Sequence, residues 1–211
     1  QWDYGVPAGG GGQYGNADPT SGATGNNVLG YNLNGDYANN LAESYLTTDP
    51  IDCSSSIGTQ LRFARWLNVE QPAYDHASIQ VSSDGSLWDT VWSNAGEITD
   101  SQWVDQQVDI SAYADGQRAL QIRWVMGTTD GGWRYSGWNI DDIRLVGQAS
   151  PLPGIGSADL DCDGVVGLQD FTIFLINFNN CASVDYCRGD IDGNGTVDTD
   201  DFSYILIQYG N

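Results

Sequence analysis

The chain ends in two copies of one short acidic pattern. Residues 159–180, DLDCDGVVGLQDFTIFLINFNN, align without a gap to residues 190–211, DIDGNGTVDTDDFSYILIQYGN. In each copy aspartate or asparagine recurs at alternate positions, a glycine follows, and a later aspartate precedes an apolar segment. Carboxylates at this spacing repel one another, so the pattern requires a neutralising partner.

The spacing matches the calcium-binding loop of an EF-hand. Oxygen ligands stand there at alternate positions, a glycine makes the sharp turn, and a carboxylate at position 12 closes the site. A solvated acidic loop would explain one copy, but two copies in register predict two Ca2+ sites. The side-chain ligands expected are Asp159, Asp161, Asp163 and Asp170 in the first loop and Asp190, Asp192, Asn194, Asp198 and Asp201 in the second. Val165 and Thr196 are expected to contribute backbone carbonyls.

A segment with helical periodicity follows each loop. Apolar residues recur there at i, i+3, i+4 and i+7, which is the spacing of one helix face. The two predicted stripes, expected to bury each other, are Phe171, Phe174, Leu175 and Phe178 and then Phe202, Ile205, Leu206 and Tyr209. The segment before the first loop contains prolines and glycines and cannot form the entering helix of a full EF-hand.

A loop and its exit helix in duplicate, over residues 159–211, resemble the dockerin type I module. The resemblance implies a small α domain of two F-hand calcium loops with helices, and it implies a cohesin scaffold as partner. The family's partner-recognition positions fall on Leu168–Gln169 and Thr199–Asp200, which are not the paired hydroxyl residues common in that family. The fold and the calcium are therefore expected, and cohesin docking is kept as an alternative.

The residues before the tail predict β-strands. Apolar and polar residues alternate in four segments, as in half-buried strands, and turn signals such as SSDGS and TTDGG separate them. The side chains expected to face inward are Leu61, Phe63, Leu67, Val69, Ala77, Ile79, Val81, Val104, Val108, Ile110, Leu120, Ile122, Trp124 and Met126. The predicted fold is mostly β, an antiparallel sandwich of two packed sheets.

Five ordered blocks in this part are similar to the jelly-roll sandwiches related to MAM and cleaved-adhesin domains. The blocks are WDYGVP, NNVLGYNLNGDY, SYLTTDPIDCSS, YDHASIQVSSDGSLWDTV and SGWNIDDIRLV, within residues 2–147. The resemblance implies a non-catalytic accessory module of a secreted bacterial protein. It also implies a further structural calcium at Asp141 and Asp142, for which ordinary surface acids are the alternative.

The same resemblance leads to an expectation about assembly. Related domains have a strand before the first block, whereas this block begins at Trp2, so one strand is expected to be missing. A sheet that lacks a strand exposes unpaired backbone groups, which pair readily with a second chain. Calcium-dependent self-association into a filament is therefore expected. The alternative is that the strand was simply lost or lies in a longer gene product.

The composition changes at QASPLPGIGSA, residues 148–158, where two prolines and two glycines stand among small polar residues. The predicted organisation is a β-sandwich domain over residues 1–147, a linker over 148–158 and a tandem calcium-binding domain over 159–211.

The net charge restricts the classes of possible partner, and the cysteine content indicates where the protein is located. The chain has 28 acidic and 7 basic residues, a net charge of −21, which excludes nucleic acid and an anionic membrane surface as partners. No apolar run approaches the roughly 18 residues that span a bilayer. Four cysteines and no lysine are typical of a protein secreted to a bacterial cell surface, and no signal segment opens the chain, so we expect it to be already processed.

Four cysteines allow three pairings. A local disulfide bond between Cys181 and Cys187 is predicted, because they stand six residues apart. By elimination Cys53 would then pair with Cys162 and join the tail to the sandwich. The alternative, in which Cys53 and Cys162 both stay free, remains open.

Few residues suit catalysis. His76 is the only histidine and no nucleophile motif is present, so no enzymatic activity is expected, although pairs of carboxylates leave glycosidase chemistry open. The remaining aromatic feature is a set of tryptophans that either stack on sugars or belong to the core. They are Trp88, Trp92, Trp103, Trp124, Trp133 and Trp138.

These observations favour a secreted, non-catalytic, calcium-binding structural or adhesive protein, which assembles with copies of itself or with other extracellular proteins. Two alternatives stay open. One is a carbohydrate-binding or targeting module of a larger secreted hydrolase, and the other is a dockerin-type protein that docks onto a cohesin.

Overall fold

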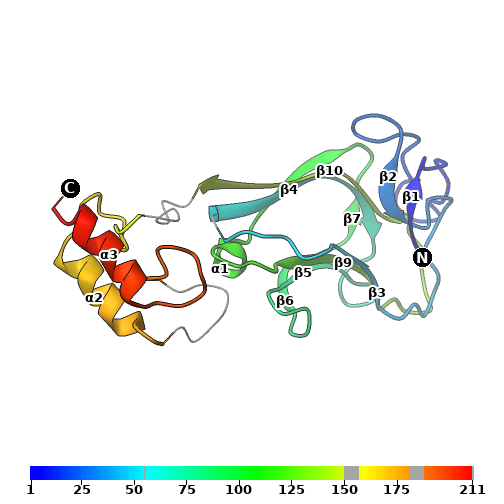
Figure 1. Ribbon diagram of the computed structural model, residues 1–211. Coiled ribbons are helices and arrows are strands. Elements are labelled where there is room, and N and C mark those ends of the chain that lie inside the picture. Colours follow the sequence, from blue (N-terminus) through cyan, green and yellow to red (C-terminus); the bar gives the residue numbers. More distant parts are fainter. Residues whose placement is uncertain (55, 150–156, 181–187, 211) are drawn as a thin grey trace. The chain divides into compact units, whose positions relative to one another are not determined.

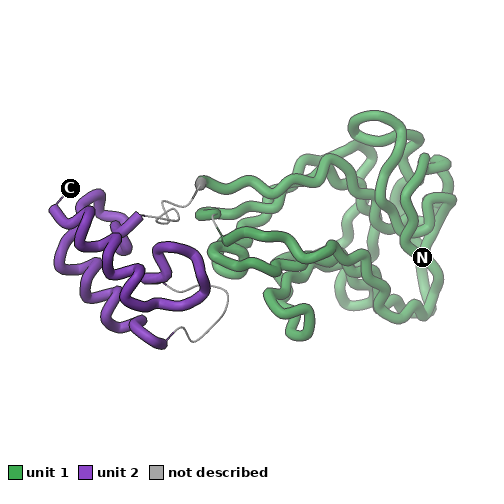
Figure 2. The backbone as a smooth tube through the Cα atoms, viewed as in Figure 1, with its two compact units in different colours: residues 1–148 green, residues 149–211 purple. Residues whose placement is uncertain are grey.

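The computed structural model describes residues 1–211 except residues 55, 150–156, 181–187 and 211. Two compact units divide the chain, residues 1–148 and residues 149–211 (Figure 2). The last strand of the first unit extends to Ala149, so it includes the first two residues of the predicted linker. No helix in the described ranges is long and apolar enough to cross a bilayer.

The first unit is a sandwich of two sheets (Figure 1). In the larger sheet the order is β1–β2–β10–β4–β7, and β8 also pairs with β4. Its strands are β1 (Trp2–Gly5), β2 (Val28–Tyr31), β4 (Ser56–Val69), β7 (Ile98–Thr99), β8 (Val104–Asp109) and β10 (Gly137–Ala149). The smaller sheet has the order β3–β9–β5–β6, with β3 (Ser44–Thr47), β5 (Ala77–Ser82), β6 (Asp89–Ser93) and β9 (Gln121–Met126). A short helix, α1 (Ser111–Ala114), follows β8.

The alternating residues fill the space between the sheets, which confirms the predicted mostly-β antiparallel class. Pairs such as β4–β8 and β5–β9 are antiparallel. The alternating residues of β4, β5 and β9 are buried, and Phe63 of β4 meets Trp124 of β9 edge-on at 5.7 Å between ring centroids. Val104 and Val108 are only half-buried, because their strand β8 pairs with β4 alone and lies at an edge.

The second unit is built from the two acidic loops and two helices, α2 (Leu168–Asn177) and α3 (Thr199–Gln208). Phe174 and Ile205 are buried as predicted, and the rings of Phe174 and Phe202 stack at 5.6 Å between the helices. The loops supply the other buried apolar side chains, which are Ala158, Leu160, Val166, Ile191 and Val197.

Part of the predicted helix pairing is wrong. Leu175, Leu206 and Tyr209 are more than half exposed. Ile173 and Tyr204 pack against the core instead. The reason is that the apolar loop residues complete the core, so each helix turns its buried face toward the loops as well as toward the other helix.

Asp18 is a buried carboxyl group of the sandwich, 4% exposed. Its Oδ1 accepts a hydrogen bond from Nδ2 of Asn139 at 2.7 Å. Its Oδ2 has no hydrogen-bond partner among the described residues. Burial raises the pKa of Asp18 to about 7.

We expect Asp18→Asn to reduce the pH dependence of stability. Because the pKa is raised in the folded state, the folded chain binds more protons than the unfolded chain between about pH 4 and 7, and the free energy of unfolding falls as pH rises through this window. Urea unfolding at pH 4.5 and 7.5 should therefore show a smaller loss of stability for the variant than for the wild type. Asp89→Asn, at an exposed strand position, is the control. Equal losses in wild type and Asp18→Asn would contradict the assignment.

Candidate metal centres

Each acidic loop of the tail is closed by a buried aspartate in the first turn of its helix. Asp170 and Asp201 are 1% and 0% exposed. Oδ1 of Asp170 accepts the N–H groups of Leu160 and Asp161 at 2.5 and 3.0 Å, and Oδ1 of Asp201 makes the equivalent pair of bonds at 2.6 and 3.0 Å. The second oxygen of each carboxylate accepts the N–H group three residues earlier, at 2.7 and 2.9 Å. The position-12 carboxylates therefore join the start of each loop to its helix.

A glycine makes the turn in both loops. Gly164 and Gly195 have φ angles of 90° and 92°, in the region that favours glycine. The N–H of Gly164 donates to Oδ2 of Asp159 at 3.0 Å, and the N–H of Gly195 donates to Oδ2 of Asp190 at 2.9 Å. The turn thus binds one oxygen of the first aspartate and leaves the other, called the inner oxygen below, unbonded to the turn.

The inner oxygens of these first aspartates are unpaired. Oδ1 of Asp159 and Oδ1 of Asp190 are buried and have no hydrogen-bond partner within the described ranges. A buried polar atom without a partner costs about 1–3 kcal/mol. The two loops leave the same atom unsatisfied, which is the arrangement expected of an atom that binds a ligand.

Each loop also brings three carboxylates close together. The first group is Asp159, Asp161 and Asp170, and the second is Asp190, Asp192 and Asp201. In each group, one carboxylate oxygen of every member lies within 4.8 Å of those of the other two. Among the residues that the structure describes, none of these acids forms an ion pair. Calcium takes several carboxylate and carbonyl oxygens at once, so the donor set fits this ion.

The other predicted ligands lie around the rim of each loop. Asp163 and Asn194 accept the N–H groups of Val165 and Thr196, at 2.8 Å in both loops. Asp198 caps α3 by accepting the N–H two residues later at 2.8 Å. The structure therefore places every predicted ligand in its loop and brings three of each loop together. Metal ligation by the rim residues and by the three close carboxylates of each loop stays a prediction.

The acids of the sandwich behave differently. Oδ2 of Asp141 and Oδ1 of Asp142 bind the N–H and the hydroxyl of Thr24, at 3.1 and 2.7 Å. They belong to no group of three close carboxylates in the described part of the chain. A structural calcium at these two residues therefore stays a prediction.

A third group of carboxylates was missed from the sequence. Glu70, Asp75 and Asp130 lie together in the sandwich, although they come from three separate segments. No motif spacing joins these residues, so only the fold brings them together.

The tryptophans do not make one sugar-stacking platform. Trp124 and Trp138 are 1% and 0% exposed and belong to the core. Trp88 is covered by Arg123, whose guanidinium carbon lies 4.0 Å from the ring centroid. Trp133 is 51% exposed. The core alternative therefore holds for at least two of the six residues.

A polar groove of about 460 Å³ lies on the larger sheet, over β4, β8 and β10. It has no tryptophan in its lining, and both charge signs occur there, from Arg62 and Arg144 and from Asp105 and Asp142. Two glutamines, Gln106 and Gln107, complete its polar surface. The groove is thus suited to a ligand that forms many hydrogen bonds.

The histidine lies at the surface of the sandwich, and Cys53 lies in its interior. His76 is exposed, and its Nδ1 lies 3.1 Å from the carbonyl oxygen of Thr128. Cys53 is buried and has a free thiol, so the structure contains no Cys53–Cys162 disulfide bond. Cys181 and Cys187 lie outside the described residues, and their predicted bond stays a prediction.

Comparison with known proteins gives one sequence relative of interest. Bacillopeptidase F of Bacillus subtilis (strain 168) is 34% identical over 146 residues, which are 68% of this chain. The chain spans only 9% of the length of that relative. No protein-family model matches the chain.

Solved structures show weaker likenesses. The K1 cleaved adhesin domain of Lys-gingipain from Porphyromonas gingivalis W83 is 15% identical, with a TM-score of 0.41 over 70% of this chain and 84% of that one. A carbohydrate-binding module of the β-sandwich superfamily is 16% identical, with a TM-score of 0.42 over 61% of this chain and 51% of that one. The sandwich is therefore defined by its own strand pairing.

We expect Asp201→Ala to expose α3 to solvent exchange. The carboxylate accepts three backbone N–H groups, and its removal leaves those donors without an acceptor, at a cost of about 3 kcal/mol or more. Hydrogen–deuterium exchange of the full chain should accelerate at least about a hundredfold over residues 199–208. Asp200→Asn is the control, because its exposed side chain has no hydrogen bond among the described residues. Unchanged protection in Asp201→Ala would contradict a structural role for this carboxylate.

Proposed function

We propose that this chain is a non-catalytic, calcium-binding module of a larger extracellular protein, in which the sandwich binds a target and the tail folds around two Ca2+ ions. The observation that carries the proposal is the buried Oδ1 of Asp159 and of Asp190, unpaired at the same position of both loops. A cation at each position would satisfy these oxygens and neutralise the carboxylates around them.

The size of the tail supports a need for calcium. A unit of this size, residues 149–211, rarely gains more than about 3–5 kcal/mol from its hydrophobic core. Calcium at a hundredfold excess over its dissociation constant adds about 2.7 kcal/mol per site. Extracellular modules bind calcium with dissociation constants of roughly 10⁻⁴–10⁻³ M, and such concentrations occur outside cells. This energetic argument supports a location outside the cell.

The sequence relative supports a place within a larger protein. Bacillopeptidase F is a peptidase by name, and the match covers a small share of it. A sandwich of this size with a polar groove is suited to an accessory role, such as holding the parent protein on a target. We therefore favour a targeting module over a free-standing structural subunit.

The groove supports carbohydrate as the target class. Its guanidinium, carboxylate and amide groups can donate to and accept from many hydroxyl groups at once. Self-assembly is the second candidate, favoured by β1, which is an edge strand of the larger sheet and offers backbone groups to another chain.

Calcium binding by the tail is tested by titration calorimetry on the full chain. Asp159→Ala and Asp190→Ala are each expected to remove one bound Ca2+, and the double variant two, because each loses the inner ligand of its loop. Asp200→Asn should bind as the wild type does. A double variant that binds as much calcium as the wild type would refute the proposal for the tail.

The target is tested on a glycan array, with light scattering in parallel. Binding that is lost in Gln107→Ala or Arg144→Ala, but kept in Glu43→Gln, is the expected result. Absence of glycan binding together with calcium-dependent growth in mass would instead favour the assembly function. A monomer that binds no glycan would exclude both target classes.

A further inference from the structure

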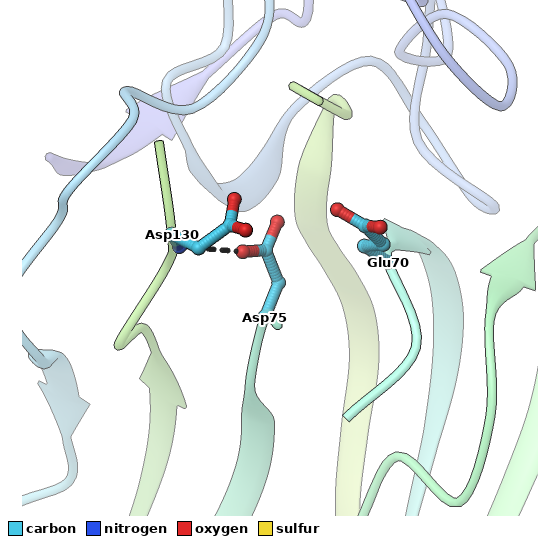
Figure 3. A group of neighbouring side chains, drawn as sticks. All are labelled: Glu70, Asp75 and Asp130. Atoms are coloured by element: carbon cyan, nitrogen blue, oxygen red, sulfur yellow. Dashed lines mark hydrogen bonds between the residues drawn. The ribbon is translucent and has the colours of Figure 1, made fainter. Parts of the chain in front are cut away.

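Three acidic side chains face one another within the sandwich (Figure 3). Glu70 follows the end of β4, Asp75 precedes β5, and Asp130 follows β9. The start of β5 and the end of β9 are neighbours, since Ala77 pairs with Met126. One carboxylate oxygen of each of the three acids lies within 4.8 Å of the others.

Asp75 is fixed in place by donors on both of its oxygens. It is fully buried, its Oδ2 accepts the hydroxyl of Tyr37, and its Oδ1 accepts the N–H of Asp130 at 2.9 Å. These bonds hold its carboxylate in one orientation and keep Asp130 beside it. Each oxygen retains a second lone pair for a further ligand.

Glu70 has no such partner. It is 7% exposed, and its carboxylate has no hydrogen bond or ion pair among the described residues. The carboxylate points toward Asp75 in Figure 3. The backbone around it is rigid, because Nδ2 of Asn94 donates to the carbonyl oxygens of Glu70 and Asp75 at 3.0 and 3.1 Å. A carboxylate that is largely removed from water and has no donor is suited to accept a cation as its partner.

The surroundings of Glu70 supply further negative charge. Burial, and then the neighbouring carboxylates of Asp75, Asp130 and Glu97, raise the pKa of Glu70. Glu97 is occupied by the hydroxyl of Tyr135, which donates to its Oε1 at 2.6 Å. In the described ranges the one ion pair, Arg65–Asp100, involves none of these groups. No ion pair among the described residues therefore relieves the repulsion between these carboxylates.

We propose that Glu70, Asp75 and Asp130 bind a calcium ion, which makes the sandwich a calcium site separate from the tail. The donors are carboxylate oxygens without histidine or cysteine, the set that hard divalent cations prefer. The ion would join the end of β4 in one sheet to the start of β5 in the other. Its role is to hold the two sheets together at this end.

The test uses the full chain and a signal confined to the sandwich. All eight tryptophans lie within residues 1–148, so tryptophan fluorescence reports the unfolding of the sandwich alone. The background is Asp159→Ala with Asp190→Ala, which disables the tail loops. In this background, calcium at a hundredfold excess over its dissociation constant should raise the Tm of the sandwich by roughly 5–10 °C.

Glu70→Gln is the decisive variant. It keeps the volume of the side chain and removes its charge, so we expect calcium to bind at least about tenfold more weakly and most of the rise in Tm to disappear. Without calcium the variant should be at least as stable as its parent, because one repulsive charge is gone. Glu43→Gln, at an exposed position, should keep the full rise.

Three results would overturn the proposal. The first is a parent whose Tm does not respond to calcium, which indicates that a proton neutralises Glu70 instead. The second is a Glu70→Gln variant that keeps the rise. The third is an equal or larger rise with magnesium, which overturns the assignment to calcium. Because the tail loops are disabled throughout, these results do not depend on calcium binding by the tail.

Discussion

Carboxylates that lack basic partners are the constraint on which the rest of this structure depends. The chain has 28 acidic residues and 7 basic ones, and Arg65–Asp100 is the one ion pair among the described residues. Backbone N–H groups donate hydrogen bonds to many of these carboxylates, which in other proteins would pair with basic side chains. Asp115 accepts the N–H groups of Gly58 and Thr59 at 2.7 and 3.0 Å, and Asp36 accepts that of Gly12 at 2.7 Å. Aspartate thus fastens loops to segments that are distant in the sequence.

This arrangement has a limit, since each N–H group satisfies one acceptor. The limit is reached at Oδ1 of Asp159, Oδ1 of Asp190 and Oδ2 of Asp18, which are buried without a hydrogen-bond partner among the described residues. The carboxylate of Glu70, in a residue that is 7% exposed, also accepts no hydrogen bond there. Asp159, Asp190 and Glu70 each belong to a group of three close carboxylates, whereas Asp18 belongs to none. The same shortage of donors therefore accounts for the candidate cation sites in both units.

The sequence was most informative where one segment contains the whole pattern. Alternation along β5 and β9 predicted buried Ile79 and Trp124, and the repeat located both acidic loops. The sequence did not predict features that depend on residues far apart in the chain. The exposure of Leu175 follows from loop residues that complete the tail core, and a 3.6-residue period does not contain that information. The third group of carboxylates forms only because β4, β5 and β9 bring Glu70, Asp75 and Asp130 together, so no local sequence pattern predicts it.

Each helix of the tail begins beside an aspartate that also belongs to the group of carboxylates in the preceding loop. Asp170 and Asp201 also accept the backbone N–H groups of Gly167 and Asp198, the residues that immediately precede α2 and α3. On the proposal that the loops bind calcium, ion binding and helix initiation would share these two side chains. A tail of this kind would gain little by folding where calcium is scarce and would fold where calcium is plentiful. An exported chain would then fold only after it had crossed the membrane.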